Sequence, residues 1–361
     1  MADAPQSDGG SPAAQPPAAR FPAAESAVVA CRRWGTLAAR TGVAVLAVAV
    51  LAGVGYLWHL RETAAGGLHT LPDDAFAGLP DRPAPASPAA DGSTPVTLLL
   101  LGSDRRVGED AGREDVTGER ADAIMLVHLS AARDRVDVLS LPRDSWVDIP
   151  GRGTAKINAS LAFGGVPLAV RTVESVTGVR VDHAMAIDFT GVRNLTTALG
   201  GVTVDNDRAS TDPLTGEHFA AGPIPLAGER ALVFLRQRYG LPEGDLDRIV
   251  RQQMLLGAIG STLADARLTT DPARLREVVR IVAGNLTVDA GLSVDRLSTL
   301  LVEVLGVPEE NIRFHTAPVA GFGRSADGQS SVLLDIAGLA EAAAAIRADR
   351  PLPLTAAPVR F

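Results

Sequence analysis

Arginine side chains are concentrated in residues 236–253, RQRYGLPEGDLDRIVRQQ. Arg236 and Arg238 are two positions apart, so an extended backbone would direct both side chains to the same side. Arg248 and Gln252 are one helical turn apart and would also share a face. Guanidinium groups stay charged and bind phosphate oxygens in pairs. The stretch therefore predicts an anion-binding site, with solvated surface charges as the alternative if it is taken alone.

A turn and a helix are predicted to position these arginines. Residues 241–244, LPEG, are typical of a turn, and Asp245 can cap a helix over residues 246–264. Apolar side chains then gather on one helix face, while Arg248 and Arg251 gather on the opposite face. We therefore expect the first face to pack and the second face to bind a ligand.

Two aspartates are predicted to meet at one edge of a sheet. The segment LLLLGSD ends an apolar run at Asp104, and RAD places Asp122 at the start of the next apolar run. If the two strands are antiparallel neighbours, both carboxylates face one edge and could share a hard cation such as magnesium. Capping of local turns is the alternative interpretation.

Two more cations stand beside the ends of predicted elements. The segment LPRD places Arg143 after an apolar run, and KIN places Lys156, the only lysine of the chain, before a predicted helix. Lys156 could hold a phosphate as a point charge, and Asn158 could support the turn there. Together with the arginines, these residues predict a site where strands end, which is where α/β sheets commonly bind ligands.

The apolar pattern predicts an α/β fold after residue 95. Continuous apolar runs over residues 96–101, 123–129 and 136–141 indicate central strands that are buried on both faces. Helical patterns cover residues 160–176, 190–199, 227–235, 246–264, 271–284, 294–305 and 334–347. We expect a single domain over residues 95–350, with a central mixed β-sheet flanked by helices, and a tail over residues 351–361.

The N-terminal part of the chain predicts where the protein works. Residues 1–36 have the composition of a disordered tail, and residues 37–60 contain an apolar run long enough for one transmembrane helix. The arginines before this run would keep the N-terminus in the cytoplasm and the domain outside the cell membrane. A cleaved signal peptide is the alternative. Residues 61–94, rich in Pro and Ala, are predicted to be a linker.

Composition and missing motifs exclude several classes of protein. The net charge of -8 gives no general reason to expect nucleic-acid binding. Cys31 is the only cysteine, which excludes an intrachain disulfide and a cysteine-based zinc site. The sequence has no His-Glu-x-x-His zinc motif, no Gly-x-Ser-x-Gly nucleophile elbow and no P-loop. Ser-His-Asp hydrolases and P-loop ATPases therefore lose support.

Seven segments of the chain together resemble the LytR-CpsA-Psr family. In order, they are LGSD, RAD, LPRD, KINA, DH to DF, LGGV, and RQRY to RIVRQQ. The resemblance runs over residues 95–264, and residues 270–361 are expected to complete the same domain. It implies that Mg²⁺ is held by Asp104 and Asp122. It implies that the pyrophosphate of a polyprenyl carrier is bound by Arg143, Lys156, Arg236, Arg238, Arg248 and Gln252. The residues expected to act at the reacting groups are Arg143, Arg238 and Asp245.

The resemblance also implies a function. We expect a membrane-anchored, Mg²⁺-dependent phosphotransferase that moves a glycopolymer from a polyprenyl pyrophosphate carrier to a peptidoglycan sugar hydroxyl. The glycopolymer could be a teichoic acid, a capsule or an arabinogalactan-like polymer. The acceptor proton could pass to Asp245 or to the pair of Asp104 and Asp122. The alternatives are a polyprenyl pyrophosphate phosphatase, in which water replaces the sugar, and a non-catalytic lipid carrier or regulatory protein.

The prenyl chain of such a carrier needs an apolar path away from the phosphates. Leu255 and Ile259 continue the helix face of Arg248 and Gln252 and could line that path. Ordinary core packing is the alternative for these two side chains.

Overall fold

The computed structural model describes residues 53, 55–71, 76, 79, 82–89, 91–103, 121–265, 271–325, 328–357 and 359. By its internal contacts the chain divides into two units, Met1–His59 and Leu60–Phe361, and the α/β fold belongs to the second. The predicted N-terminal tail over residues 1–36, most of the predicted transmembrane helix and Asp104 lie outside the described residues. Within the described part, no helix has both the length and the apolar character needed to span a membrane.

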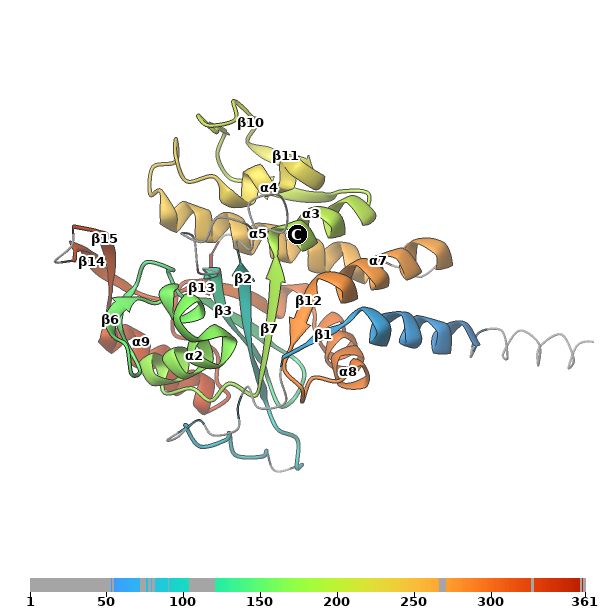
Figure 1. Cartoon of the computed structure of the whole chain (residues 1–361), viewed down its shortest axis with the longest axis horizontal. Coiled ribbons are helices and arrows are strands. Elements are labelled where there is room, and N and C mark those ends of the chain that lie inside the picture. Colours follow the sequence, from blue (N-terminus) through green and yellow to red (C-terminus); the bar gives the residue numbers. More distant parts are fainter. Residues whose placement is uncertain are drawn as a thin grey trace, which may run out of the picture. The chain divides into compact units, whose positions relative to one another are not determined.

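A seven-stranded mixed sheet forms the centre of the second unit (Figure 1). Along the sheet the order is β1 (His69–Thr70), β12 (Leu286–Val288), β7 (His183–Asp188), β2 (Val96–Ser103), β3 (Ala121–Leu129), β4 (Val136–Ser140) and β13 (Ile312–Thr316). β7 runs parallel to β2, β3 runs antiparallel to both of its neighbours, and β13 runs parallel to β4. The expected α/β fold with a central mixed sheet is therefore confirmed.

Helices cover both faces of this sheet (Figure 1). α2 (Ala159–Thr177) and α9 (Ile336–Arg347) share one apolar core with Leu99 of β2. α8 (Val294–Leu305) shares another core with Leu98 of the same strand. Since neighbouring residues of a strand point to opposite faces, both faces need apolar side chains. This is why β2 has a continuous apolar sequence.

A third apolar core joins four helices to a pair of short strands. Its members come from α3 (Phe189–Ala198), α4 (Gly228–Arg236), α5 (Asp245–Ala264), α7 (Pro272–Asn285), β8 (Val202–Asn206) and β11 (Gly222–Leu226). The remaining short elements are β5 (Trp146–Ile149), β6 (Gly153–Lys156), β9 (Ser210–Thr211), β10 (His218–Phe219), β14 (Val319–Arg324), β15 (Ser330–Leu334) and the 3-10 helix η1 (Glu309–Asn311). Each helical pattern found in the sequence corresponds to one of these helices, within two residues at either end.

Several strand ends meet at one edge of the central sheet. β2 ends at Ser103, which pairs with Ala121 at the start of β3 and with Asp188 at the end of β7. β4 ends at the same edge, because Ser140 pairs with Met125 of β3. β2 and β3 are thus antiparallel neighbours, which is the arrangement that a site shared by Asp104 and Asp122 requires. Residues that follow β2, β4 and β7 are brought close to the start of β3.

Helix α5 is fixed to this edge by one buried amide. The side chain of Gln253 is fully buried. Its Nε2 donates to Ser140 Oγ at 2.9 Å and to the carbonyl oxygen of His315 at 3.0 Å. α5 is thereby attached to the ends of both β4 and β13.

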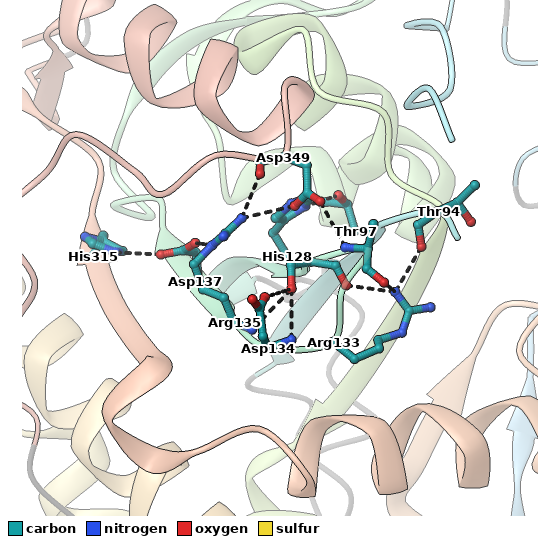
Figure 2. A network of polar contacts seen from close by, with 11 residues as sticks. Thr94, Thr97, His128, Arg133, Asp134, Arg135, Asp137, His315 and Asp349 are labelled. Carbon is teal, nitrogen blue, oxygen red and sulfur yellow. Dashed lines mark hydrogen bonds and ion pairs between the residues drawn. The ribbon is translucent and has the colours of Figure 1, made fainter. Parts of the chain in front are cut away.

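A buried polar network lies at the opposite end of the sheet (Figure 2). His128 of β3 lies between Thr97 Oγ1, 3.0 Å from Nδ1, and Asp349 Oδ1, 3.0 Å from Nε2. Asp349 follows α9 with a left-handed backbone (φ 49°), and its carboxylate also accepts hydrogen bonds from Ala131 N and Arg135 Nη2. Burial lowers the pKa of His128, so the ring is neutral at neutral pH. The network joins the end of α9 to β3.

Part of the predicted linker over residues 61–94 packs on the domain. β1 pairs with β12 at the sheet edge. Arg82 Nη2 lies 2.7 Å from Oε1 of Glu174, a buried residue of α2, and donates to the Val181 carbonyl oxygen at 2.5 Å. These contacts hold the described part of that segment against α2 and the sheet.

Candidate active site

A pocket of about 550 Å³ opens where the strand ends meet. Phe189 after β7, Asp122 near the start of β3 and Arg143 after β4 contribute to its wall, and α4 and α5 supply much of the rest. The predicted site residues that line it are Asp122, Arg143, Arg236, Arg238, Arg248 and Gln252. The structure thus brings together side chains that are far apart in the sequence.

Arg143 and Asp122 form the ion pair at the floor of the pocket, through Nη1 and Oδ1. Arg143 Nε also lies 3.8 Å from Asp144 Oδ2. Burial opposes the charged form of Arg143, but the carboxylates of Asp122, Asp144 and Asp245 outweigh that effect and raise its pKa. The guanidinium therefore keeps its positive charge in a half-buried place.

Arg248 reaches the pocket from the first turns of α5. Only 5% of its surface is exposed, and its Nη1 lies 3.3 Å from Asp245 Oδ1. Burial and the charge of Arg143 lower its pKa. Among the described residues, neither Arg143 Nε nor Arg248 Nε has a hydrogen-bond acceptor, although both atoms are buried. Two buried guanidinium donors without acceptors are suited to an oxyanion ligand.

A pair of carboxyl groups lies behind these arginines. Burial opposes ionisation of Asp144, but the hydrogen bond with Asp245 and the charges of Arg143 and Lys156 lower its pKa. Burial raises the pKa of Asp245, against the charge of Arg248, and the hydrogen bond to Asp144 adds to the rise. Lys156 Nζ lies 3.1 Å from Asp144 Oδ1. Lys156 and Asp245 support the pocket from behind, and neither is part of its lining.

The predicted cap at Asp245 is wrong. The helix begins one residue earlier than expected, with Gly244 in the capping position and no side-chain cap. Asp245 is the first residue of α5, and its carboxylate faces Asp144 and Arg248. A turn with a left-handed Gly244 (φ 55°) brings the carboxylate inward instead of over the helix end.

Arg236 and Arg238 are held by aromatic rings. Arg236, the last residue of α4, lies over Phe189 with 5.0 Å from its guanidinium carbon to the ring centroid. Arg238 lies 4.7 Å over Tyr239 and donates from Nη2 to the Tyr239 hydroxyl at 2.8 Å. Between them Gln237 is buried and also contributes to the pocket wall. Both arginines line the pocket, as their spacing predicts.

The expectation that one whole face of α5 binds ligand is wrong for Arg251. This side chain is 4% exposed and lies between the rings of Phe219 and Phe234, at 5.4 and 4.3 Å. It donates to Gln237 Oε1 and to Ser210 Oγ, both at 2.6 Å. Burial lowers its pKa to about 10. α5 is enclosed on both faces, so Arg251 is a structural residue.

Leu255 and Ile259 pack in the interior of the domain. Leu255 is 1% exposed and belongs to the third apolar core, and Ile259 packs against that core. Neither side chain lines the pocket. Core packing is therefore the interpretation that the structure favours for both.

Of the two aspartates predicted to hold a metal ion, the structure describes Asp122. Its backbone carbonyl accepts from Gln252 Nε2 at 3.2 Å, which ties α5 to β3. Among the described residues there is no group of three or more His, Cys, Asp or Glu side chains arranged to hold a metal ion. The second predicted ligand, Asp104, lies outside those residues.

Sequence reasoning missed several residues of the site. Asp144 directly follows Arg143 in the LPRD segment, so its position was a usable signal. Leu214 and Glu229 line the pocket from separate elements and carry no local pattern that marks them. Tyr239 also lines the pocket and stands beside Arg238, where an aromatic ring next to a predicted phosphate-binding arginine could have been noticed.

Residues 80–347 match the model of the LytR_cpsA_psr family. The polyisoprenyl-teichoic acid–peptidoglycan teichoic acid transferase TagU of Bacillus anthracis is 38% identical over 199 residues, which are 55% of this chain and 62% of that protein. The cell wall biosynthesis protein LcpA of Corynebacterium glutamicum is 30% identical over 357 residues, which are 87% of this chain and 66% of that protein. This chain therefore matches less than two thirds of the length of these relatives.

Solved structures share the fold. The crystal structure of B. subtilis TagV aligns with a TM-score of 0.59, covering 72% of this chain and 98% of that chain. Its sequence is 22% identical to this one, so the likeness concerns the fold alone.

Proposed function

This chain belongs to the LytR-CpsA-Psr family, and on that premise we propose that it is a membrane-anchored phosphotransferase. It moves a glycopolymer from a polyprenyl pyrophosphate carrier to a sugar hydroxyl of peptidoglycan. The names of TagU, a teichoic acid transferase, and LcpA, a cell wall biosynthesis protein, support this reaction. The observation that carries the proposal is the convergence of four arginines on one pocket, two of them with buried Nε atoms that lack an acceptor among the described residues.

The arginines suit the charge changes of such a transfer. An acceptor hydroxyl attacks the sugar-linked phosphorus, the bond from that phosphorus to the bridging oxygen breaks, and the lipid phosphate leaves with the electron pair. Negative charge then accumulates on the leaving phosphate. Arg143 and Arg248 are already fixed by Asp122 and Asp245, so they stabilise that charge without having to reorient.

Lys156 has a different role in this proposal from the one implied by the family resemblance. Its ammonium contacts Asp144 at 3.1 Å and does not line the pocket. It keeps Asp144 ionised, and Asp144 in turn holds Arg143 in place. We therefore assign Lys156 to positioning the phosphate-binding arginine.

We propose Mg²⁺ as the cofactor. Asp122 Oδ1 is paired with Arg143, whereas no hydrogen bond from a described residue engages Oδ2. Carboxylate oxygens beside substrate phosphates are the ligands that Mg²⁺ commonly takes. Asp122 and Asp104 would hold the ion, which when bound adds positive charge next to the phosphate oxygens.

We propose that a carboxylate of the pocket accepts the proton of the acceptor hydroxyl. Of the carboxylates considered from the sequence, Asp122 is the described one that lines the pocket. Asp245 is a poor direct base, because it is paired with Arg248 and does not line the pocket. Asp122 is therefore the candidate to test first.

We also propose that residues 37–60 anchor the protein in the cell membrane with the domain on the outer side. The length of the uncharged run and the arginines before it support this arrangement. A carrier with its prenyl chain in the membrane would then present its pyrophosphate on the same side as the pocket.

The transfer can be tested with the full-length protein in detergent. A synthetic polyprenyl pyrophosphate oligosaccharide, Mg²⁺ and peptidoglycan fragments are incubated with it, and the products are identified by mass spectrometry. We expect a phosphate-linked sugar adduct that is lost in Arg143→Ala. The matched control is Arg280→Ala, because Arg280 is an exposed arginine paired with Glu277 on α7, outside the pocket.

Two other products would change the conclusion. Free sugar phosphate without an adduct would indicate a polyprenyl pyrophosphate phosphatase. Tight carrier binding without either product would indicate a lipid carrier or regulatory protein.

A further inference from the structure

The pocket continues beyond the arginines along one face of α4. Glu229, Leu232, Val233 and Arg236 all line it, and their spacing of three, four and seven residues places them on a single helix face. Arg236 stands at the arginine end. Glu229 stands about 10 Å away along the helix axis, at 1.5 Å per residue. We call the part lined by Leu214, Glu229, Leu232, Val233 and Tyr239 the distal arm.

Within the described part of the chain, the carboxylate of Glu229 is free. It has no hydrogen bond or ion pair with any residue that the structure describes. An acidic residue in the first turn of a helix also stabilises the helix dipole, which would explain its presence on α4 but not its position in the pocket wall. The distal arm thus offers a hydrogen-bond acceptor of opposite charge to the arginine end.

The loop between β9 and β10 lines the pocket with Asp212, Leu214 and Thr215. The carboxylate of Asp212 accepts hydrogen bonds from Thr215 N at 3.2 Å and Thr215 Oγ1 at 2.7 Å, which closes the loop on itself. Gly240 has a left-handed backbone (φ 75°), and a side chain there would come within 2.9 Å of the Thr211 carbonyl oxygen. Close packing of these two segments holds Leu214, which is 76% exposed, at the pocket.

The ring of Tyr239 is the aromatic element of the arm. The ring is packed by Arg238, and the residue is still 49% exposed. Its hydroxyl accepts a hydrogen bond from Arg238, and its backbone carbonyl accepts one from Gln237 Nε2 at 3.1 Å. The ring is therefore oriented before any ligand arrives.

An exposed aromatic ring, aliphatic side chains and a free carboxylate in the wall of one pocket match a ligand with apolar ring faces and many hydroxyl donors. A hydrocarbon chain fits poorly, because it would remove water from the Glu229 carboxylate without giving it a partner. We propose that the distal arm binds a saccharide, with Glu229 accepting hydrogen bonds from its hydroxyls and Tyr239 and Leu214 packing against its ring. The assignment rests on the proposed function, in which both the donor and the acceptor carry sugars next to the reacting phosphorus.

Binding measurements on the full-length protein in detergent test the arm. The probes are inorganic pyrophosphate, a sugar pyrophosphate, a prenyl pyrophosphate without sugar, and a disaccharide fragment of peptidoglycan. The variants are Glu229→Gln and Tyr239→Ala. The matched control is Glu341→Gln, because Glu341 is an exposed glutamate on α9 outside the pocket.

We expect Glu229→Gln to weaken a sugar-bearing probe roughly five- to tenfold, the effect of losing a charge-assisted hydrogen bond. Loss for the sugar pyrophosphate would identify the donor glycan as the occupant, and loss for the disaccharide would identify the acceptor. Inorganic pyrophosphate should bind within twofold of wild type. Tyr239→Ala should weaken the same sugar-bearing probe.

Two results would overturn the saccharide assignment. The first is binding of both sugar-bearing probes within twofold in both variants. The second is a loss confined to the prenyl pyrophosphate, which would make the arm a lipid site. If wild type bound no pyrophosphate while sugar binding still depended on Glu229, the transferase proposal would fail and the saccharide arm would stand.

Discussion

Asp144 and Asp245 place two carboxyl groups side by side behind the arginine pocket, where each shifts the pKa of the other. Burial raises the pKa of Asp245, whereas Arg143 and Lys156 help to lower that of Asp144. Asp245 is therefore the less acidic member of the pair, and Asp144 is the more acidic one. The residue that the sequence marked as a reacting group thus lies beside a second carboxyl group that holds its charge more readily.

The first prediction separates these two carboxyl groups. Asp245→Asn should lower kcat/KM less than Asp144→Asn does, because the amide keeps an oxygen for Arg248 and can donate to Asp144, the more acidic carboxyl group. Asp144→Asn should lower kcat/KM more than tenfold, because it removes the charge that fixes Arg143 and leaves Lys156 buried without its partner. Steady-state kinetics of the transfer reaction at neutral pH would measure both. Equal losses in the two variants would contradict the proposed difference between the two carboxyl groups.

The second prediction concerns the geometry of Arg143. Arg143→Lys keeps the charge but loses the planar fork that binds Asp122 and a phosphate together. We expect the dissociation constant of inorganic pyrophosphate to rise about 10- to 100-fold, equivalent to about 1.5–3 kcal/mol for charge-assisted hydrogen bonds. Calorimetric titration would measure it, with Arg280→Lys as the exposed control. An unchanged affinity would show that Arg143 acts only as a point charge.

The third prediction concerns the anchor of α5. Gln253→Met has a similar length but removes the amide that binds Ser140 and His315. Leaving these buried acceptors unsatisfied should lower the free energy of unfolding by about 1–3 kcal/mol. It should also weaken pyrophosphate binding at temperatures where the protein stays folded, because Arg248 and Gln252 are on the same helix. Denaturant unfolding and calorimetry would test this, and stability loss with full affinity would limit Gln253 to packing.

The fourth prediction uses the pKa of His128. Burial lowers this pKa in the folded state, so the unfolded chain binds more protons at mildly acidic pH. The stability that the neutral ring contributes is complete above its unfolded pKa of about 6.5 and is lost as the pH falls toward the folded pKa. The Tm should therefore decrease as the pH falls from 7 to 5. His128→Gln should be less stable at pH 7 and show a shallower decrease; an identical slope would assign the pH dependence to other groups.

The fifth prediction tests whether α5 lines a lipid path. Leu255→Ala should cost about 2–5 kcal/mol of stability, as for other buried leucines. Below its unfolding transition, the variant should bind a polyprenyl pyrophosphate as tightly as wild type. A selective loss of prenyl affinity, with inorganic pyrophosphate unaffected, would restore the lipid-path interpretation. Scanning calorimetry and ligand titration provide the two measurements.

Local patterns were sufficient to predict the helices and three of the seven strands of the central sheet, but not β1, β7, β12 or β13. β2, β3 and β4 are covered on both faces, so each has a continuous apolar sequence that can be recognised without partners. The helices likewise show their own periodicity. The order of the seven strands depends on pairings between distant segments, such as β4 with β13, which no local pattern encodes.

For the charged residues of the site, roles were harder to predict from the sequence than positions. Arg248 and Arg251 are three residues apart and look alike in the sequence, yet Arg248 faces the pocket and Arg251 is enclosed by Phe219 and Phe234. The difference arises because β10 and α4 close over one side of α5. Likewise, the raised pKa of Asp245 depends on its burial and on Asp144, which approaches it only in the folded chain. Charge type could be predicted from sequence, but pairing and protonation required the tertiary structure.

The attachment of Gln253 to the carbonyl oxygen of His315 links residues 62 positions apart and thus sets an order of assembly during synthesis. β2, β3 and β4 can pair as soon as they emerge, because they are neighbours in the sequence. β4 stays an open edge until β13 has been made, which exposes a strand able to pair with other chains. The attachment of α5 to the sheet is complete only after that late strand is added. We therefore expect a polypeptide interrupted before β13 to hold α5 less firmly and to aggregate more readily than the whole chain.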